Sequence, residues 1–463
     1  MKTKTFAASS CAVLLCTIFL AAQNREVNWP TYAGDNQRSG WQRIETRITK
    51  DNVRNVQLLW KLKLDVQPKG PRPLLPPVIL GRLISYRGFK ELAFVGTNAD
   101  IVYALDADLG KIFWTKHLEY ASIEPQATGS SAACPGGLTA MPVMPAPAAA
   151  GRGARGGAGP FVTGPASLYA ISSDGRIHRL NTSTGDDIAQ PVAVLPPNAR
   201  VSSLNMVENT IYAVTSQNCN DAPDAVWAID LNGDAPKSVS FPLAGIGAGS
   251  SGVAVGADGT VYAASANTLY ARTPRELKLR QSFSVPGANA AISSSPVVFN
   301  YKNRDLVAVT GNDGRVYLLD SGRFSAGVVT EGGTPDSIST WEDAAGARWV
   351  LVSISGRGSS AGSIASFKVE EQAGRAVLSP GWVSREMNSP VQPVIANGMV
   401  FALSTSGRAI LYALDASTGK ELYSSRNLVT GPASPTGITV TNGRAYFGAA
   451  DGTFYAFGMY LEH

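Results

Sequence analysis

One short pattern recurs along this chain: an apolar alternating stretch, a turn, and a second apolar stretch that usually ends in Asp or Asn. The clearest copies are residues 102–106, 226–230, 316–320 and 411–415, and weaker ones are 177–181, 269–273, 364–368 and 454–458. Counted from Asp106, successive copies lie 75, 49, 43, 47, 48, 47 and 43 residues apart. A period of about 40–50 residues, with four short strands per unit, is typical of propeller blades. We therefore predict an all-β chain folded as an eight-bladed β-propeller.

The strands of one unit can be placed from alternation and turn signals. Residues 295–299, 305–310 and 315–320 read as the first three strands, and 327–330 reads as a weak fourth strand. Asn312-Asp313-Gly314 predicts a hairpin between the second and third strands, and similar Asp-Gly turns occur at 174–175, 258–259 and 451–452. No long segment has a 3.6-residue period, so little helix is expected.

The last unit ends near Tyr460 without an obvious outer strand, which would leave an open sheet edge. Residues 56–65 alternate like a strand and precede the first complete unit. We predict that this N-terminal strand closes the last blade. The expected divisions are a signal peptide over 1–22, an N-terminal extension over 23–55 and the propeller over 56–463.

The first 22 residues are typical of an export signal. Lys2 and Lys4 precede an apolar run over residues 11–22, which is short for a bilayer span. We expect a periplasmic or secreted protein without a transmembrane segment in the mature chain. An uncleaved membrane anchor is the alternative interpretation of the same residues.

Two cysteines remain after residues 1–22, and an even pair in an exported chain favours one disulfide. Cys134 and Cys219 are expected in loops on the same face of adjacent blades, so we predict that they pair. Residues 145–160, rich in Ala, Gly and Arg, read as a flexible low-complexity loop. A basic docking arm is the alternative interpretation of that loop.

Charge and histidine content exclude several function classes. The net charge is +5 without a run of Lys or Arg, so nucleic-acid binding is not expected. The three histidines, His117, His178 and His463, are widely spaced, which predicts no metal site built on histidine. A Ser-His-Asp site would have to use His117 or His178, and the sequence shows no nucleophile elbow for one.

Two segments carry a family resemblance. Residues 104–114 and 413–423 repeat the order Ala-x-Asp, Gly four residues later and an aromatic residue four after that, ending in Trp114 and Tyr423. This pattern resembles the pyrroloquinoline-quinone (PQQ) repeat, and residues 29–35 with Leu59-Trp60 resemble the opening of quinoprotein alcohol dehydrogenase-like propellers. In that repeat the Gly turns between the third and fourth strands. We expect Trp60, Trp114 and Trp382 to dock each blade on the next.

The resemblance covers the propeller and implies less about its chemistry. Family dehydrogenases hold the quinone on the propeller axis with a disulfide between adjacent cysteines, a Trp and a calcium bound by Glu, Asn and Asp. None of these residue sets can be aligned in this chain. The family also includes a propeller lipoprotein of the outer-membrane barrel assembly machine, which binds no quinone.

Candidate site residues therefore come from the funnel face, where the loops that enter each inner strand meet the hairpins between second and third strands. The inner-strand loops offer Ser294, Asn388 and Ser389, and hairpins add Asp313. Arginines that could converge on a carboxylated ligand are Arg176, Arg315, Arg357 and Arg408. Solvated surface arginines are the alternative interpretation.

Two functions follow from this sequence. The first is a non-catalytic binding or assembly propeller that takes a protein, peptide or glycan partner at the funnel face, with no cofactor and no metal. The alternative is a PQQ-dependent dehydrogenase that oxidises an alcohol or sugar with calcium and a divergent site.

Overall fold

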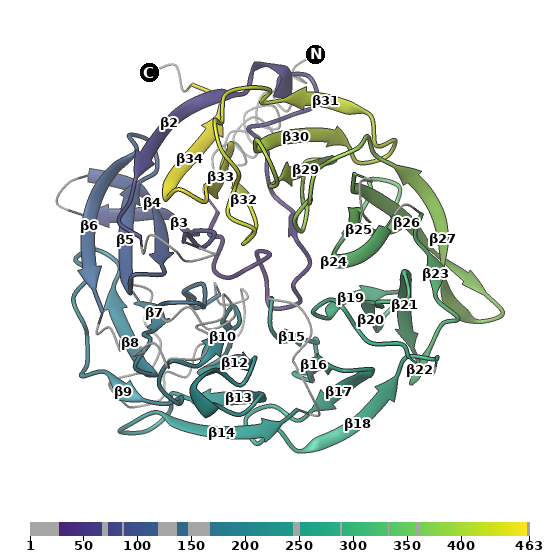
Figure 1. Ribbon diagram of the computed structural model, residues 1–463, viewed down its shortest axis with the longest axis horizontal. Helices are drawn as coiled ribbons and strands as arrows, with labels where there is room; N and C mark the ends of the chain where they lie inside the picture. Colours follow the sequence, from purple (N-terminus) through teal and green to yellow (C-terminus); the bar gives the residue numbers. More distant parts are fainter. Residues whose placement is uncertain are drawn as a thin grey trace, which may run out of the picture.

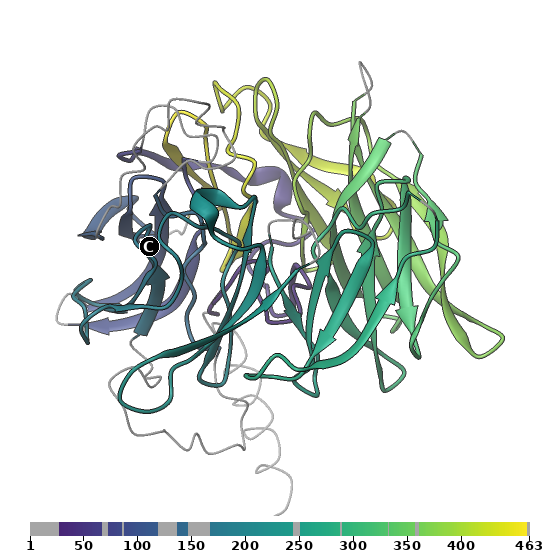
Figure 2. The ribbon, with the colours of Figure 1, turned by 60° about the horizontal axis from the view of Figure 1, so that its bottom comes forward.

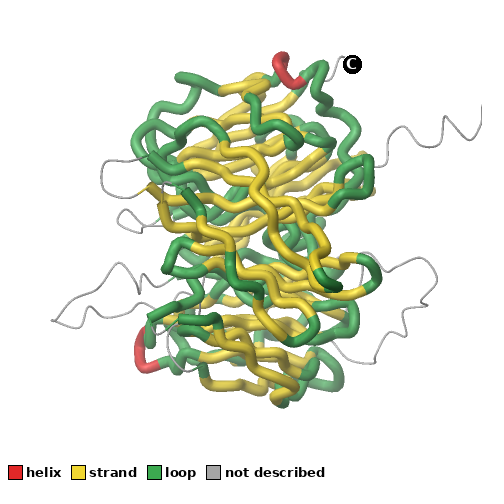
Figure 3. The backbone as a smooth tube through the Cα atoms, turned by 90° about the vertical axis from the view of Figure 1, so that its right-hand side faces the viewer, coloured by secondary structure: helices red, strands yellow, loops and turns green. Residues whose placement is uncertain are grey.

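Eight β-sheets stand around a central axis in the computed structural model of the protein, as the repeat predicts (Figure 1). The structure describes residues 27–66, 73–85, 88–118, 137–146, 167–243, 251–287, 289–331, 333–356 and 361–460. Helix is confined, in these ranges, to two short 3-10 segments, η1 (Val53–Asn55) and η2 (Cys219–Asp221) (Figure 3). The prediction of an eight-bladed all-β propeller is confirmed.

Each blade runs from an inner strand at the axis to an outer strand at the rim, with antiparallel neighbours. Blade one consists of β3 (Val78–Ser85), β4 (Gly88–Thr97), β5 (Ile101–Asp106) and β6 (Lys111–His117), and blade two of β7 (Ser167–Ile171), β8 (Arg176–Asn181) and β9 (Val192–Ala193). Blade three consists of β10 (Arg200–Val201), β11 (Asn205–Val207), β12 (Thr210–Ser216), β13 (Ala225–Asp230) and β14 (Lys237–Pro242). Blade four consists of β15 (Ala254–Val255), β16 (Val261–Ser265), β17 (Thr268–Arg272) and β18 (Leu279–Ser284). Blade five consists of β19 (Val297–Tyr301), β20 (Arg304–Thr310), β21 (Arg315–Asp320), β22 (Arg323–Phe324) and β23 (Val328–Val329). Blade six consists of β24 (Gly333–Glu342), β25 (Arg348–Gly356), β26 (Ser363–Gln372) and β27 (Arg375–Val383). Blade seven consists of β28 (Val394–Ala396), β29 (Met399–Ser404), β30 (Ile410–Asp415) and β31 (Glu421–Ser424), and blade eight of β32 (Thr439–Thr441), β33 (Arg444–Gly448) and β34 (Thr453–Gly458).

Three blades depart from the regular pattern. In blade two, Val143 takes the inner position through a bridge to Tyr169. The inner edge of blade three is divided between β10 and β11, which both pair with β12. The weak fourth strand of blade five is likewise divided between β22 and β23.

Asp258-Gly259 joins the first and second strands of blade four, unlike the other three Asp-Gly turns.

The ring is closed by the N-terminal strand β2 (Gln57–Lys63), which pairs antiparallel with β34 and gives blade eight its outer strand. Gln57 lies opposite Gly458 and Lys63 opposite Thr453. The prediction made from the open edge is confirmed. Two strands far apart in the sequence, β2 and β34, thus pair within the last blade.

Residues 29–42, the channel segment, lie before β2 in the chain and run through the centre of the ring (Figures 1 and 2). Its backbone carbonyls accept hydrogen bonds from inner-strand amides of four blades, and these acceptor–donor pairs are Asn36–Val255, Gln37–Val298, Ser39–Thr340 and Gly40–Ile395. Trp29 bridges Ile79 of β3, and β1 (Trp41–Gln42) pairs parallel with β28. No sequence signal predicted that part of the N-terminal extension fills the channel.

Arg38 anchors this channel segment. Its fully buried guanidinium donates to the carbonyls of Ser203 and Leu204 between β10 and β11, and to the carbonyl of Val253 before β15. It also donates to Thr31 Oγ1 and the carbonyl of Tyr32. Desolvation by burial lowers the pKa of Arg38 to about 9. The interrupted inner edge of blade three therefore supplies two of the carbonyls that hold this cation.

Candidate functional site

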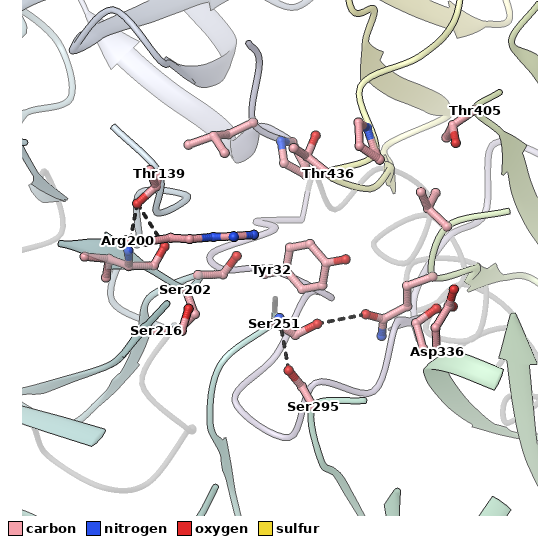
Figure 4. A pocket seen from close by; sticks show the side chains of 18 of the residues that line it. Tyr32, Thr139, Arg200, Ser202, Ser216, Ser251, Ser295, Asp336, Thr405 and Thr436 are labelled. Carbon is pink, nitrogen blue, oxygen red and sulfur yellow. Dashed lines mark hydrogen bonds between the residues drawn. The ribbon is translucent and has the colours of Figure 1, made fainter. Parts of the chain in front are cut away.

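A cavity of about 490 Å³ opens where the inner strands meet the channel segment (Figure 4). Its walls come from the loops entering the inner strands and from the ends of the second strands, which share one face of the ring. Tyr32 of the channel segment also lines it. Twelve of its 27 lining residues are serine or threonine. The cavity is therefore rich in hydroxyl groups.

Many of these hydroxyl groups donate their proton to the protein itself. Thr405 Oγ1 donates to the carbonyl of Ser389, and Thr436 Oγ1 to that of Leu74, both at 2.8 Å. Ser251 Oγ donates to Gln392 Oε1 at 3.3 Å. A hydroxyl that has given up its proton keeps acceptor lone pairs. The cavity wall thus offers mainly hydrogen-bond acceptors.

Asp336 is the carboxylate in the described lining. It is the extra residue of a bulge in β24, because Pro335 pairs with Ile354 and Ser337 with Ser353. Asp336 Oδ1 accepts a 2.5 Å hydrogen bond from Ser353 Oγ, and its Oδ2 accepts one from Ser355 Oγ. Desolvation by burial raises the pKa of Asp336. The bulge therefore positions a half-buried acid in the cavity wall.

Arg200 brings the opposite charge to the cavity. It lies in β10, where its backbone pairs with Ser216, and it lines the cavity on the side away from Asp336 (Figure 4). The side chain is half-buried. Neither Arg200 nor Asp336 was among the residues selected from the sequence.

Of the candidates chosen from the sequence, Ser389 lines the cavity. The described hairpin arginines bond toward the outer edge of their own blades. Arg176 Nη1 donates to the carbonyl of Pro191, Arg315 Nη1 to that of Gly327 and Arg408 Nη1 to Asn427 Oδ1, at 3.2, 3.1 and 2.6 Å. These three arginines are not among the described lining residues, so they do not converge on the axis.

The remaining candidates have local partners. Asp313 accepts hydrogen bonds from the Arg315 amide and from Tyr317 Oη. Ser294 is buried, and its Oγ accepts a hydrogen bond from the backbone amide of Thr310. Asn388 is exposed, and its backbone amide donates to Ser404 Oγ. Arg357 lies outside the described residues.

The three tryptophans expected to dock blades have the same environment. Trp60, Trp114 and Trp382 donate from Nε1 to the carbonyls of Ala107, Thr182 and Ala416, each at 2.9 Å. Each acceptor lies in the turn before the fourth strand of the following blade. A Cβ placed on the glycine of that turn, Gly110, Gly185 or Gly419, would approach the indole within 2.4–2.7 Å. Only glycine lets the rings lie this close.

Cys219 is buried at the start of η2. Cys134, the signal segment 1–22 and residues 147–160 of the low-complexity loop lie outside the described residues. The Cys134–Cys219 disulfide therefore stays a prediction.

The structure brings together a Ser-His-Asp set that the sequence did not reveal. His178 Nε2 lies 3.2 Å from Ser172 Oγ, and its Nδ1 lies 2.9 Å from Asp187 Oδ1. Ser172 and His178 are 3% and 2% exposed, so a substrate does not reach them. Ser172 Oγ also donates to Asp174 Oδ1, so its single proton is already committed. These contacts stabilise the second blade, and they do not activate Ser172 as a nucleophile.

The described lining of the cavity does not fit a calcium-bound quinone. Calcium takes about six to eight oxygen ligands and favours carboxylates, whereas the described lining supplies one carboxylate, already bonded to two serines. Across the parts of the chain that the structure describes, no three His, Cys, Asp or Glu side chains are placed to share a metal ion. In those same parts, no helix has the length and apolar character to span a membrane.

Residues 362–459 match the sequence profile of the PQQ_2 family, described as outer membrane protein assembly factor BamB. The matched stretch runs from β26 to β34 and includes the repeat at 413–423. The resemblance to the PQQ repeat is thereby confirmed. A search among curated proteins finds no significant match.

Several solved propellers share the fold at low identity. Quinohemoprotein alcohol dehydrogenase from Comamonas testosteroni is 13% identical with a TM-score of 0.59, over 96% of this chain and 83% of its own. A europium-containing methanol dehydrogenase is 12% identical with a TM-score of 0.59, over 96% and 100%. BamB from Moraxella catarrhalis is 15% identical with a TM-score of 0.52, over 88% and 99%. At these identities the likeness concerns the fold, which dehydrogenases and BamB share.

Proposed function

We propose that the protein is an exported, non-catalytic binding or assembly propeller that holds a protein or peptide partner at its funnel face. The observation that carries this proposal is the composition of the cavity wall. Several of its hydroxyl groups donate to backbone carbonyls of the loops that form it, and the charged groups of its described lining are one acid and one guanidinium. Such a wall can bind an extended polar ligand through hydrogen bonds, and its described residues do not supply the carboxylate set that a calcium site favours.

The family match supports the same proposal, because the matched profile is described as an assembly factor. Export rests on the signal-like segment 1–22, and a periplasmic or secreted location follows from it. The dehydrogenase alternative draws on the fold likeness to quinoprotein dehydrogenases over 96% of the chain. The single described carboxylate of the cavity argues against it.

Site-specific photocrosslinking in the cell that makes the protein tests this proposal. A photoreactive residue replaces Ser389 in the cavity, and a matched control replaces the exposed Asp234 in the turn between β13 and β14, on the opposite face. We expect a discrete crosslinked partner at position 389 and none at position 234. Equal crosslinking at both positions, or none at 389, would contradict a funnel-face partner.

A further inference from the structure

The two charged groups of the described cavity lining stand on different walls. Arg200 belongs to blade three and Asp336 to blade six, with Tyr32 between them in the close view (Figures 1 and 4). A ligand that fills the space between these walls meets a cation at one end and an anion at the other. A cavity of about 490 Å³ is within the usual size for small-ligand sites.

Among the described residues, Asp336 has no cationic partner. Ser353 and Ser355 donate hydrogen bonds to Asp336 but carry no charge. Among the described residues no Lys, Arg or His forms an ion pair with it, although such pairs are common elsewhere on the molecule. Burial also raises the pKa of Asp336, which means that its ionised form is costly without a counter-ion. A cationic nitrogen of a ligand would remove that cost.

The uncharged part of the cavity wall presents hydrogen-bond acceptors, so it suits a ligand that carries hydrogen-bond donors. Ser293 Oγ donates to the carbonyl of Pro335 at 2.8 Å, and Thr139 Oγ1 donates to that of Val201 at 3.0 Å, in addition to the committed hydroxyls described above. Thr139 Oγ1 also accepts from the Val201 backbone amide, and the lone pairs that remain on these hydroxyl groups suit N–H groups. At the other wall, the guanidinium of Arg200 suits a carboxylate, which it can bind through two parallel hydrogen bonds.

We propose that the cavity selects a short zwitterionic ligand, with its cationic nitrogen at Asp336, its carboxylate at Arg200 and its amide N–H groups along the hydroxyl wall. A short peptide with both ends free has this chemistry. The inference rests on the proposed function, since it takes the cavity as the binding site, and it adds the class of ligand.

Calorimetric titration of the full mature protein with triglycine, N-acetyl-triglycine and triglycinamide tests the inference. The acetyl group removes the ligand's cation, and the amide removes its anion. We expect wild-type protein to bind triglycine at least about tenfold more tightly than either blocked peptide, since each blocked end loses a charged hydrogen bond. Equal binding of the three peptides, no binding of triglycine, or tighter binding of a neutral oligosaccharide would overturn the inference.

Variants assign each end of the ligand. Asp336→Asn should abolish the preference for a free amino end and keep the preference for a free carboxylate, and Arg200→Gln should do the reverse. Arg176→Gln, an exposed arginine outside the cavity, is the matched control and should bind like wild type. Loss of both preferences in each variant would contradict the assignment. If a variant does not fold, the comparison of triglycine with its two blocked forms on wild-type protein still tests the inference.

The outcomes also separate this inference from the proposed function. A partner that crosslinks at position 389 while triglycine and its blocked forms bind equally would refute the zwitterion and leave the binding propeller standing. Absence of both results would refute both.

Discussion

The indole of Trp60 lies against Gly110, and this contact joins the last blade to the first. Trp60 is in β2, the outer strand of blade eight, and Gly110 is in the turn between β5 and β6 of blade one. Trp60 Nε1 donates to the carbonyl of Ala107 at 2.9 Å, and a Cβ on Gly110 would lie 2.5 Å from the ring. Strand pairing within blade eight and ring packing between blades thus close the propeller at one place.

Replacement of Trp60 by alanine should open this closure. We expect a loss of about 3 kcal/mol in the free energy of unfolding, the lower end for a large aromatic side chain because Trp60 is only half-buried. Urea denaturation followed by fluorescence or circular dichroism measures it. The exposed Tyr460 provides the control, and Tyr460→Ala should change stability little. A Trp60→Ala protein as stable as the control would show that the contact does not close the ring.

The repeat and the closing strand could be predicted from sequence because their signals are local. The spacing from Ala104 to Trp114 encodes a strand, a glycine turn and a docking ring within eleven residues. An open edge in the last unit then left few partners for 56–65. Both signals depend on backbone geometry that neighbouring residues determine.

The site could not be predicted in the same way. Arg38 donates to backbone carbonyls of residues far away in sequence. Because every residue type has a backbone carbonyl, the sequence does not indicate which residues accept these hydrogen bonds. Asp336 reaches the cavity through a bulge, which shifts its direction relative to strict alternation. Arg176, Arg315 and Arg408 follow recognisable turns, but the turn does not determine whether the side chain points to the axis or the rim.

Arg38→Met should destabilise the whole ring. The substitution removes the cation and leaves the buried carbonyls of Ser203, Leu204 and Val253 without this donor, so we expect a loss of about 3–5 kcal/mol. Arg43→Met is the control, because Arg43 makes an exposed ion pair with Asp35. Chemical denaturation of both variants decides, and equal stabilities would contradict an anchoring role for Arg38.

Asp100 should make stability fall as pH rises. It is buried and accepts hydrogen bonds from the amide and hydroxyl of Ser173, and burial raises its pKa from 3.8 to about 6. Between these values the folded protein holds a proton that the unfolded chain has released, so this residue's contribution is complete below 3.8. It is then lost at about 1.4 kcal/mol per pH unit until about pH 6.

Asp100→Asn removes this titration while keeping an acceptor oxygen for Ser173. We expect its stability relative to wild type to improve between pH 4 and pH 6.5, as measured by urea denaturation at both values. A difference between the two proteins that is independent of pH would refute the assignment.

The predicted disulfide between Cys134 and Cys219 can be tested by thiol counting. Closing a loop of about 85 residues would restrict the unfolded chain by about 4 kcal/mol in the entropy description. Alkylation of the oxidised, denatured mature protein should modify neither cysteine until a reductant is added. Two alkylated thiols without reductant would rule the disulfide out.

The central claim, a binding propeller without a quinone centre, is tested most directly by titrating the mature protein with PQQ, with and without calcium. Wild type and the Arg200→Ala, Asp336→Asn double variant are compared by calorimetry, together with an alcohol and sugar dehydrogenase assay with an artificial electron acceptor. The account predicts no submicromolar PQQ binding, no effect of calcium and no dehydrogenase activity, because the one carboxylate of the described lining falls short of the oxygen ligands that calcium favours. Submicromolar, calcium-dependent binding that the double variant loses would contradict it and establish the dehydrogenase instead.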